Sequence, residues 1–241
     1  MSAPAPAVLV FSAHAADFVW QAGATIALYA SRGYRVRILC LSFGERGESQ
    51  GAWKEPGMTV DQIKDIRRAE ASRGAALLGA EIRFFDAGDH PIQLAHDAVD
   101  AIVEEYRAVQ PSFVLTHSAS DPYNFDHPTA HLVSLQTRGY AQAHGYPVPG
   151  KPLGAPPVFM FEPHQPERCG FRPDVLLDVT AAWHAKHRAM ESLQAQRHLW
   201  EYCTDLGRRR GAQAVRNGGA ASITYAEAFE RVYPQVTGDL L

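Results

Sequence analysis

The sequence predicts a three-layer α/β fold, in which a mostly parallel, Rossmann-like sheet is flanked by helices. Two observations predict it. Short apolar runs rich in Val, Ile and Leu alternate along the chain with longer segments of helical spacing, and this alternation is typical of parallel sheets covered by helices. The length of 241 residues and the hydrophobic fraction of 46% fit one large domain that spans residues 1–241.

The apolar runs place the strands, and the spacing of apolar residues places the helices. We expect strands at residues 7–11, 34–42, 81–86, 112–116, 158–161 and 174–179. We expect helices at residues 18–32, from 59 or 61 to 79, at 91–110, 127–144 and 180–203, and as a short tail at 225–232. Thr59 and Asp61 are both suitable N-caps, and Pro128 suits a first helical turn.

Composition excludes several classes of protein. A formal net charge of −3 provides no basic surface for nucleic acid, and no apolar run approaches the roughly 20 residues of a membrane span. The start, residues 1–6, has no charged segment followed by a long apolar one, so we expect no signal peptide. The cysteines are scattered and form no Cys-x-x-Cys motif, which indicates reduced thiols in a cytoplasmic protein.

Chemically active side chains cluster directly after the predicted strands. They lie in the segments 12–17, 43–48, 116–127 and 162–164. The carboxyl ends of parallel strands meet at one edge of a sheet, and ligands of such folds bind there. We therefore expect these segments to share one rim and to build the functional site.

His14 and Asp17 lie three residues apart in the turn between the first strand and the first helix. A histidine and a carboxylate at this spacing can face one point above the sheet, as two ligands of a catalytic metal. Taken alone, the spacing favours a simpler interpretation, in which Asp17 caps the helix and His14 fills the turn.

A third candidate ligand, His127, opens a later helix beside Asp126. Together with His14 and Asp17 it would form an open set of two imidazoles and one carboxylate. Such a set suits a catalytic Zn²⁺, and it also suits Fe²⁺ or Mn²⁺. His131, one turn later, is either a rival ligand or a half-buried helix residue, and we favour the second interpretation.

Two motifs resemble those of the LmbE-like, or PIG-L, family of metal-dependent N-acetylglucosaminyl deacetylases. Ala13-His14-Ala-Ala-Asp17 lies where the family has Ala-His-Pro-Asp-Asp-Glu, and Asn124-Phe-Asp126-His127 lies where it has His-Pro-Asp-His. Further similar segments are Arg68-Ala-Glu70 with Leu78-Gly79, and the helix from Lys186 to Gln196. The resemblance covers most of the chain. It implies the family's fold, a zinc site, and the metal ligands His14, Asp17 and His127.

The sequence departs from the family at the residues that perform hydrolysis. Ala16 occupies the position of the family's general base, and Asn124 occupies the position of the histidine that stabilises the oxyanion. Alanine cannot accept a proton, and loss of such a base costs on the order of 10²–10⁴ in rate. The departing pattern, with Ser42-Phe-Gly-Glu-Arg-Gly-Glu48-Ser after the second strand, is similar to that of a hydratase on this scaffold. The resemblance implies addition of water across a C=C bond of an unsaturated tricarboxylate, in the degradation of aromatic compounds such as gallate.

A hydration of this kind requires a base for water and an acid for carbon. Glu48 lies on the expected rim and is our candidate base, whereas Glu45 in the same loop is interpreted as structural or solvated. His164, after a later strand, is our candidate proton donor, since histidine changes its protonation near neutral pH. The competing interpretations are a solvent-facing loop charge for Glu48 and a hydrogen-bonded loop histidine for His164.

A tricarboxylate substrate also requires cations and hydrogen-bond donors. Arg46, in the loop after the second strand, can pair bidentately with a carboxylate. Ser49 in that loop, and Tyr123 and Asn124 in a later one, are further candidates for substrate binding. The basic run at 208–210 is interpreted as a solvated loop. The expected partners are a small tricarboxylate and further copies of this chain, with nucleic acid and membrane excluded.

Two other functions remain open at this point. The first is a zinc-dependent N-deacetylase of an N-acetylglucosaminyl substrate, in which Glu48 or another carboxylate has replaced the base. The second is a binding module that keeps the fold without turnover, for which Ala16 and Asn124 are the expected changes. An assay of both substrate classes, with and without a chelator, distinguishes these functions.

Overall fold

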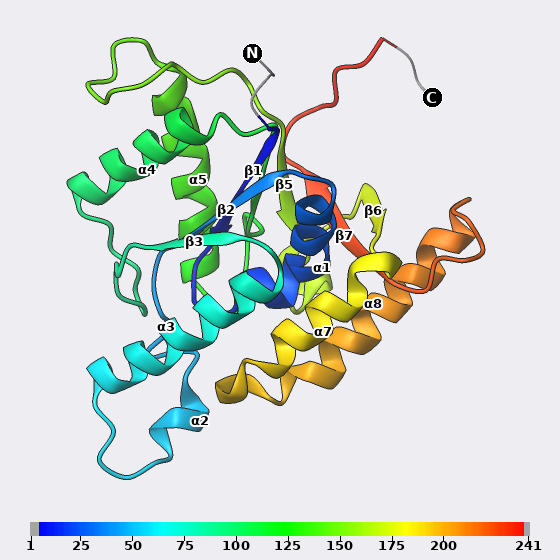
Figure 1. Ribbon diagram of the computed structural model, residues 1–241, viewed down its shortest axis with the longest axis horizontal. Helices are drawn as coiled ribbons and strands as arrows, with labels where there is room; N and C mark the ends of the chain where they lie inside the picture. Colours follow the sequence, from blue (N-terminus) through cyan, green and yellow to red (C-terminus); the bar gives the residue numbers. More distant parts are fainter. Residues whose placement is uncertain (1–4, 239–241) are drawn as a thin grey trace.

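The computed structural model describes residues 5–238, which build a seven-stranded mixed sheet (Figure 1). The strand order is β3-β2-β1-β4-β5-β7-β6. The strands are β1 (Ala7–Ser12), β2 (Arg35–Cys40), β3 (Glu81–Phe84), β4 (Phe113–Thr116), β5 (Val158–Phe161), β6 (Val175–Asp178) and β7 (Ala226–Arg231). β7 runs antiparallel to both of its neighbours, and the other neighbouring pairs are parallel. Residues 1–4, on which the expectation about a signal peptide partly depends, lie outside the described residues.

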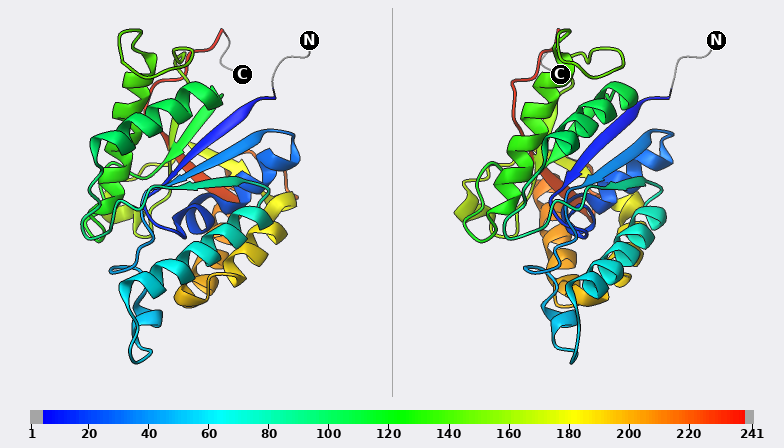
Figure 2. Two further views of the ribbon diagram at one scale, coloured as in Figure 1. Left: turned by 60° about the vertical axis from the view of Figure 1, so that its left-hand side comes forward. Right: turned by 90° about the vertical axis from the view of Figure 1, so that its left-hand side faces the viewer.

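Helices cover both faces of this sheet, so the predicted three-layer α/β architecture is confirmed (Figure 2). One layer contains α1 (Asp17–Ser31), α3 (Val60–Leu77), α7 (Trp183–Glu191) and α8 (Leu199–Arg216). The other contains α4 (His96–Val109) and α5 (Asp126–Gln142). The short elements are α2 (Gln50–Trp53), α6 (Pro166–Cys169), and the 3₁₀ turns η1 (Thr180–Ala182) and η2 (Gln194–Gln196). Among the described residues, no helix combines the length and the apolar character that a bilayer crossing requires.

β1 lies inside the sheet between β2 and β4, and every one of its residues is buried. Val8 and Val10 point into the core beneath α1, whereas Leu9 and Phe11 point into the core beneath α4 and α5. A strand covered on both faces needs a continuous apolar run rather than an alternating one. The run at 7–11 meets that requirement, and the strand therefore delivers the turn that follows it to a fixed position.

The helical tail predicted at 225–232 is wrong, because these residues form β7. β7 fills the gap between β5 and β6 and forms a ladder with each. Its residues Ala226, Ala228 and Phe229 are buried. Hydrogen-bond partners far away in the sequence select this strand, and they override the local helix preference of its Ala and Glu residues.

The single helix predicted at 180–203 is interrupted, and α8 continues to Arg216, so the basic run at 208–210 is helical and not a loop. The interruption at η2 turns Gln196 inward. Its side-chain oxygen accepts hydrogen bonds from Trp20 Nε1 at 3.2 Å and from Arg67 Nη2 at 3.0 Å. These partners are distant in the sequence, so no local pattern indicates the break.

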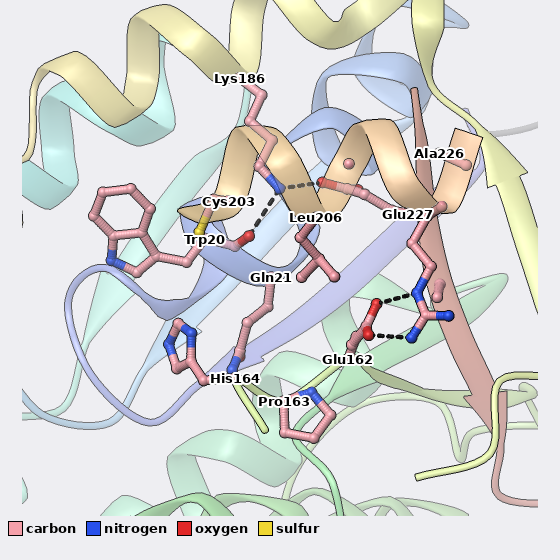
Figure 3. A pocket seen from close by; sticks show the side chains of 13 residues that line it. Trp20, Gln21, Glu162, Pro163, His164, Lys186, Cys203, Leu206, Ala226 and Glu227 are labelled. Carbon is pink, nitrogen blue, oxygen red and sulfur yellow. Dashed lines mark hydrogen bonds and ion pairs between the residues drawn. The ribbon is translucent and has the colours of Figure 1, made fainter. Parts of the chain in front are cut away.

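A buried ion pair joins α7, β7 and α1 (Figure 3). Lys186 Nζ lies 2.6 Å from Glu227 Oε1 and donates to the Trp20 carbonyl oxygen at 2.8 Å. The Glu227 carboxylate accepts backbone N–H groups of Ala24 and Thr25 in the middle of α1, at 3.1 and 2.8 Å. Both charged side chains are at most 5% exposed, so each depends on the other for compensation of its charge.

Lys186→Met is expected to lower the free energy of unfolding by about 3–5 kcal/mol, since it leaves the Glu227 carboxylate buried without its counter-ion. Urea denaturation followed by circular dichroism measures the change. The matched control is Arg208→Met, which removes an exposed ion pair with Asp205 on α8 and is expected to have little effect. Equal stability of the two variants would show that the buried pair is not required.

Candidate metal centre

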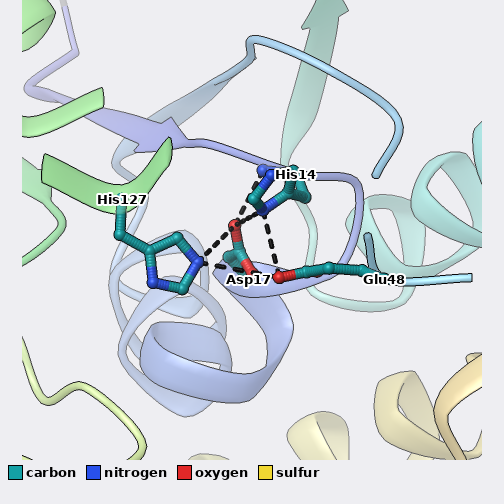
Figure 4. A group of neighbouring side chains, drawn as sticks. All are labelled: His14, Asp17, Glu48 and His127. Carbon is teal, nitrogen blue, oxygen red and sulfur yellow. Dashed lines mark hydrogen bonds and ion pairs between the residues drawn. The ribbon is translucent and has the colours of Figure 1, made fainter. Parts of the chain in front are cut away.

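The ends of β1, β2 and β4 meet at one edge of the sheet, as the rim prediction requires. The turn after β1 carries His14 and Asp17, the loop after β2 carries Glu48, and His127 lies in the first turn of α5. One ligand atom from each of these four residues lies within 4.8 Å of the others (Figure 4). The structure therefore brings together the three predicted metal ligands and adds the predicted base to the same group.

The spacing of these four atoms fits a single small cation. His14 Nδ1 lies 3.3 Å from Asp17 Oδ2 and 3.1 Å from Glu48 Oε1. His127 Nε2 lies 3.7 Å from both of the same oxygens. Ligand atoms at about 2.0–2.2 Å from a tetrahedral zinc ion are roughly 3.3–3.6 Å apart. The observed separations lie close to this range.

The two imidazole nitrogens that face this point, His14 Nδ1 and His127 Nε2, are buried and have no hydrogen-bond partner within the described part of the chain. The opposite nitrogen of each ring faces a carboxylate. His14 Nε2 lies 3.3 Å from Asp126 Oδ2, and His127 Nδ1 lies 2.8 Å from Asp121 Oδ2. Metal-binding histidines have this arrangement, with one nitrogen free for the metal and the other oriented by a carboxylate. The residues present therefore fit a divalent metal.

The electrostatics of the group also favour a cation. Burial lowers the pKa of His14, but the carboxylates of Glu48 and Asp17 raise it well above its ordinary value. Burial raises the pKa of Asp17, but His127 and His14 lower it well below its ordinary value. The carboxylates thus stay ionised, and they attract positive charge to the point that the four residues surround.

The turn that carries His14 and Asp17 is fixed by its own hydrogen bonds. Ser12 Oγ donates to the His14 carbonyl oxygen at 2.6 Å and accepts from Phe18 N–H at 3.2 Å. His14 N–H donates to Asp17 Oδ2 at 2.7 Å. The N-terminus of α1 has no side-chain cap, so Asp17 orders the turn without capping the helix.

Asp121 and Asp126 have no role among the predictions from the sequence, although both lie in the stretch 121–131 that supplied His127. Hydrogen bonds from the backbone N–H groups of His90 and Ile92, at 2.8 Å each, also reach Asp126. Together with His14 they hold its pKa at about 2, against the effect of burial. Spacing alone does not reveal this role, because it depends on the β3–α4 loop, which is distant in the sequence.

Asp121→Asn is expected to weaken zinc binding by about 10- to 100-fold, because the amide no longer stabilises the His127 ring as a carboxylate does. Competition between the zinc-loaded protein and a chromogenic chelator measures the affinity. Asp205→Asn, at an exposed position of α8, is the matched control and should bind zinc as the unchanged protein does. Unchanged affinity in Asp121→Asn would contradict the assigned role.

Arg46 and Ser49, both predicted to bind substrate, lie in the loop after β2. Their side chains differ in how accessible they are to a ligand. The Arg46 side chain is exposed and donates from Nη1 to the Asp89 carbonyl oxygen at 2.8 Å. The buried Asp89 carboxylate in turn accepts the backbone N–H groups of Arg46 and Gly47. Ser49 is fully buried, and its hydroxyl donates to the Gly44 carbonyl oxygen at 2.7 Å. The Ser49 hydroxyl hydrogen is therefore used within the loop.

Tyr123 and Asn124, the other predicted substrate contacts, precede α5. Tyr123 is 59% exposed. Asn124 Nδ2 donates to Glu48 Oε1 at 2.9 Å, and its Oδ1 accepts the backbone N–H of Asp126 at 3.1 Å. Asn124 thus links the candidate base to the segment that carries His127.

Three further residues have defined places. Glu45 is buried and both of its carboxylate oxygens lack hydrogen bonds within the described residues, so it is not solvated; burial raises its pKa. His131 donates from Nδ1 to the His117 carbonyl oxygen at 2.9 Å, and it lies outside the four-residue group. His164 follows β5, and burial lowers its pKa, as does the nearby charge of His127.

Comparisons with known proteins agree with this architecture. The family model described as PIG-L, GlcNAc-PI de-N-acetylase, matches residues 9–137. The chain is 50% identical to 4-oxalmesaconate hydratase of Pseudomonas putida KT2440, over 100% of this chain and 94% of that protein. It is 30% identical to a 1D-myo-inositol 2-acetamido-2-deoxy-alpha-D-glucopyranoside deacetylase of Rhodococcus erythropolis, over 66% of this chain and 62% of that protein.

Solved structures show the same relationship. The crystal structure of GalB, the 4-carboxy-2-hydroxymuconate hydratase from Pseudomonas putida KT2440, matches with a TM-score of 0.95 and 50% identity, over 98% of this chain and 100% of that one. The N,N'-diacetylchitobiose deacetylase from Pyrococcus horikoshii has the same fold, with a TM-score of 0.77 and 19% identity over 95% of this chain and 84% of that one. The family match covers more than half of this chain and contains all four residues of the metal centre. The chain therefore belongs to the PIG-L family.

Proposed function

We propose that this protein is a metal-dependent hydratase that adds water to a C=C bond of 4-oxalomesaconate (4-carboxy-2-hydroxymuconate) and forms 4-carboxy-4-hydroxy-2-oxoadipate. Identity of 50% with the Pseudomonas putida hydratase along the full chain supports this reaction. Ala16, at the place of the family's proton-accepting aspartate, argues against hydrolysis of an amide.

The observation that carries the proposal is the position of Glu48. Its carboxylate enters the metal centre from the loop after β2, and Asn124 holds its Oε1. Glu48 Oε2 is buried and without a hydrogen-bond partner among the described residues. Burial and Asp17 raise the pKa of Glu48, but His14 and His127 lower it well below its ordinary value. The carboxylate is therefore ionised and has one oxygen free to take a proton.

His14, Asp17 and His127 would hold the metal, for which we propose Zn²⁺. A divalent ion supplies Lewis acidity toward oxygen atoms of the substrate. Glu48 Oε2 accepts a proton from water while the water oxygen forms a bond to the carbon that becomes C4 of the product. His164 delivers a proton to a neighbouring carbon, which balances the addition. Because burial lowers its pKa, its protonated ring is a stronger acid than free imidazolium.

The remaining assignments follow from the same reaction. Asn124 bonds to Glu48 Oε1, and we propose that Asn124, Arg46 and Tyr123 contact the tricarboxylate or its attacking water. Ser49 stabilises the loop through the hydrogen bond that its hydroxyl donates to the Gly44 carbonyl oxygen. The product class fits degradation of gallate and related aromatic acids, and the free buried cysteines support a cytoplasmic setting.

An activity assay tests the proposal directly. Purified, zinc-loaded protein is mixed with 4-oxalomesaconate, and loss of the conjugated chromophore is followed before and after treatment with a chelator. We expect rapid, chelator-sensitive loss of absorbance and negligible release of acetate from an N-acetylglucosaminyl substrate. Release of acetate without hydration would favour the deacetylase, and tight binding of tricarboxylates without turnover would favour a binding module.

A further inference from the structure

A cavity of about 550 Å³ lies between α6 and α8, beyond the end of β5. Its wall includes His164, Tyr202 and Gln213, and charged residues line it from both helices. Cavities of a few hundred Å³ with a small number of placed polar groups are typical of small-molecule sites. None of the roles assigned above, apart from that of His164, uses this cavity.

Two arginines of α8 line the cavity, but they differ in what they bind. Arg210 donates from Nε to Glu162 Oε2 at 2.8 Å and forms a second bond from Nη2 to Glu162 Oε1, so its charge is compensated. Arg209 is exposed, and within residues 5–238 it has no hydrogen bond or ion pair. Arg209 is therefore the cation at this cavity that is available to a ligand.

The loop that carries His164 begins beside the candidate metal centre. Phe161, three residues before His164, packs against His117, and the His117 ring stacks on that of His127 with 4.3 Å between the ring centroids. His164 itself lines the cavity wall, and the charges of His127, Glu48 and Asp17 influence its pKa. On the side of α1, a smaller space of about 20 Å³ shares the lining residues Glu162, His164 and Arg210 with this cavity (Figure 3). Gln21 is 7% exposed, and its side-chain oxygen has no hydrogen-bond partner within the described chain. His164 therefore borders both the cavity that contains Arg209 and the inner space that contains Gln21.

We propose that this cavity binds the carboxylate arm of the substrate that is remote from the metal centre, and that Arg209 is its cationic partner. The inference rests on the proposed hydratase function and deepens it. A tricarboxylate cannot place all of its charges at the metal centre, where Asp17 and Glu48 are already ionised. An unpaired guanidinium beyond His164 binds one carboxylate on the far side of the proposed proton donor.

Glu167 of α6 also lines the cavity, and no ion pair compensates its charge within the described residues. Glu167 would repel a substrate carboxylate, so its replacement should change KM in the direction opposite to replacement of Arg209. Arg209→Ala is expected to raise KM for 4-oxalomesaconate by about 10- to 100-fold, the loss typical of a hydrogen-bonded charged partner. Glu167→Gln is expected to lower KM. In both variants kcat should change little, because the lost interaction acts on substrate and transition state alike.

Arg208→Ala is the matched control, since Arg208 neighbours Arg209 on α8 but pairs with Asp205 and does not line the cavity. It should leave KM unchanged, and Arg209→Lys should lie between Arg209→Ala and the unchanged protein. An equal rise of KM in Arg208→Ala and Arg209→Ala would overturn the inference, because it would indicate a nonspecific electrostatic effect of the positive charges on α8. Unchanged KM in Arg209→Ala would overturn it as well.

Calorimetry of the same variants with saturated acids separates this inference from the proposed reaction. Tricarballylate, with three carboxylates, should bind the unchanged protein about tenfold or more tightly than glutarate, with two. Arg209→Ala should lose this preference, and Arg208→Ala should keep it. A preference that survives in Arg209→Ala overturns the subsite even if hydration is observed. Loss of the preference supports it even if hydration of 4-oxalomesaconate fails.

Discussion

Glu48→Gln is expected to reduce kcat for hydration by on the order of 10²–10⁴ while the bound metal is retained. The amide keeps the size of the side chain, and its oxygen can still accept the hydrogen bond from Asn124 that Glu48 Oε1 accepts now. It cannot take a proton from water at neutral pH. Steady-state kinetics and metal analysis of the same preparation measure the two quantities together.

Glu45→Gln is the matched control for this prediction. Glu45 lies in the same loop and is also buried, but it is not part of the four-residue metal centre. Its replacement removes a buried carboxylate whose ion-pair partner is Lys64, 3.9 Å away, and should leave kcat close to its original value. If Glu48→Gln instead loses metal and activity in parallel, Glu48 completes the coordination of the ion, and another group must be the base.

His14→Ala is expected to abolish stable metal binding and, with it, measurable hydratase activity. The variant removes Nδ1 from the group, leaving one imidazole and two carboxylates, and it leaves the Asp126 carboxylate without the ring that it orients. Loss of one of three protein ligands from an open site is more severe than loss of an orienting carboxylate, which costs about 10- to 100-fold. Metal analysis after dialysis, followed by the hydration assay, measures both effects.

His131→Asn provides the comparison, because it removes an imidazole one turn beyond His127. Its amide can still donate to the His117 carbonyl oxygen that His131 now contacts. The variant should retain its metal and most of its activity. A full metal content in His14→Ala, or loss of metal in His131→Asn, would show that the ligand set has been assigned incorrectly.

Rules that act on neighbouring residues predicted much of this molecule. Buried apolar runs predicted β1 and β2, and the convergence of parallel strand ends predicted that His14, Glu48 and His127 would meet. The fold and the family were also accessible from the motifs around His14 and His127. These predictions succeed because a strand, a turn and a helix start each depend on a short segment of the chain.

The remaining features depend on partners that are distant in the sequence. β7 is a strand because β5 and β6 offer ladders on both sides, and the break before α8 occurs where Gln196 reaches Trp20 and Arg67. The sequence alone does not show which of the neighbouring arginines Arg209 and Arg210 is paired, because the partner of Arg210 is the distant Glu162. In each case the identity of the residue is compatible with several structures, and the packing of the whole chain selects one.

The candidate base Glu48 and the proposed metal ligands His14, Asp17 and His127 lie on separate segments of the chain. In the deacetylase motif the proton-accepting aspartate and the metal-binding aspartate are adjacent residues of one turn, whereas here that turn keeps Asp17 and the Glu48 carboxylate reaches the same point from the loop after β2. With Glu48 as the base, substitutions in this loop are expected to alter the reaction while the residues that would hold the ion stay in place. This separation would give evolution a route from one reaction to another without loss of the metal site.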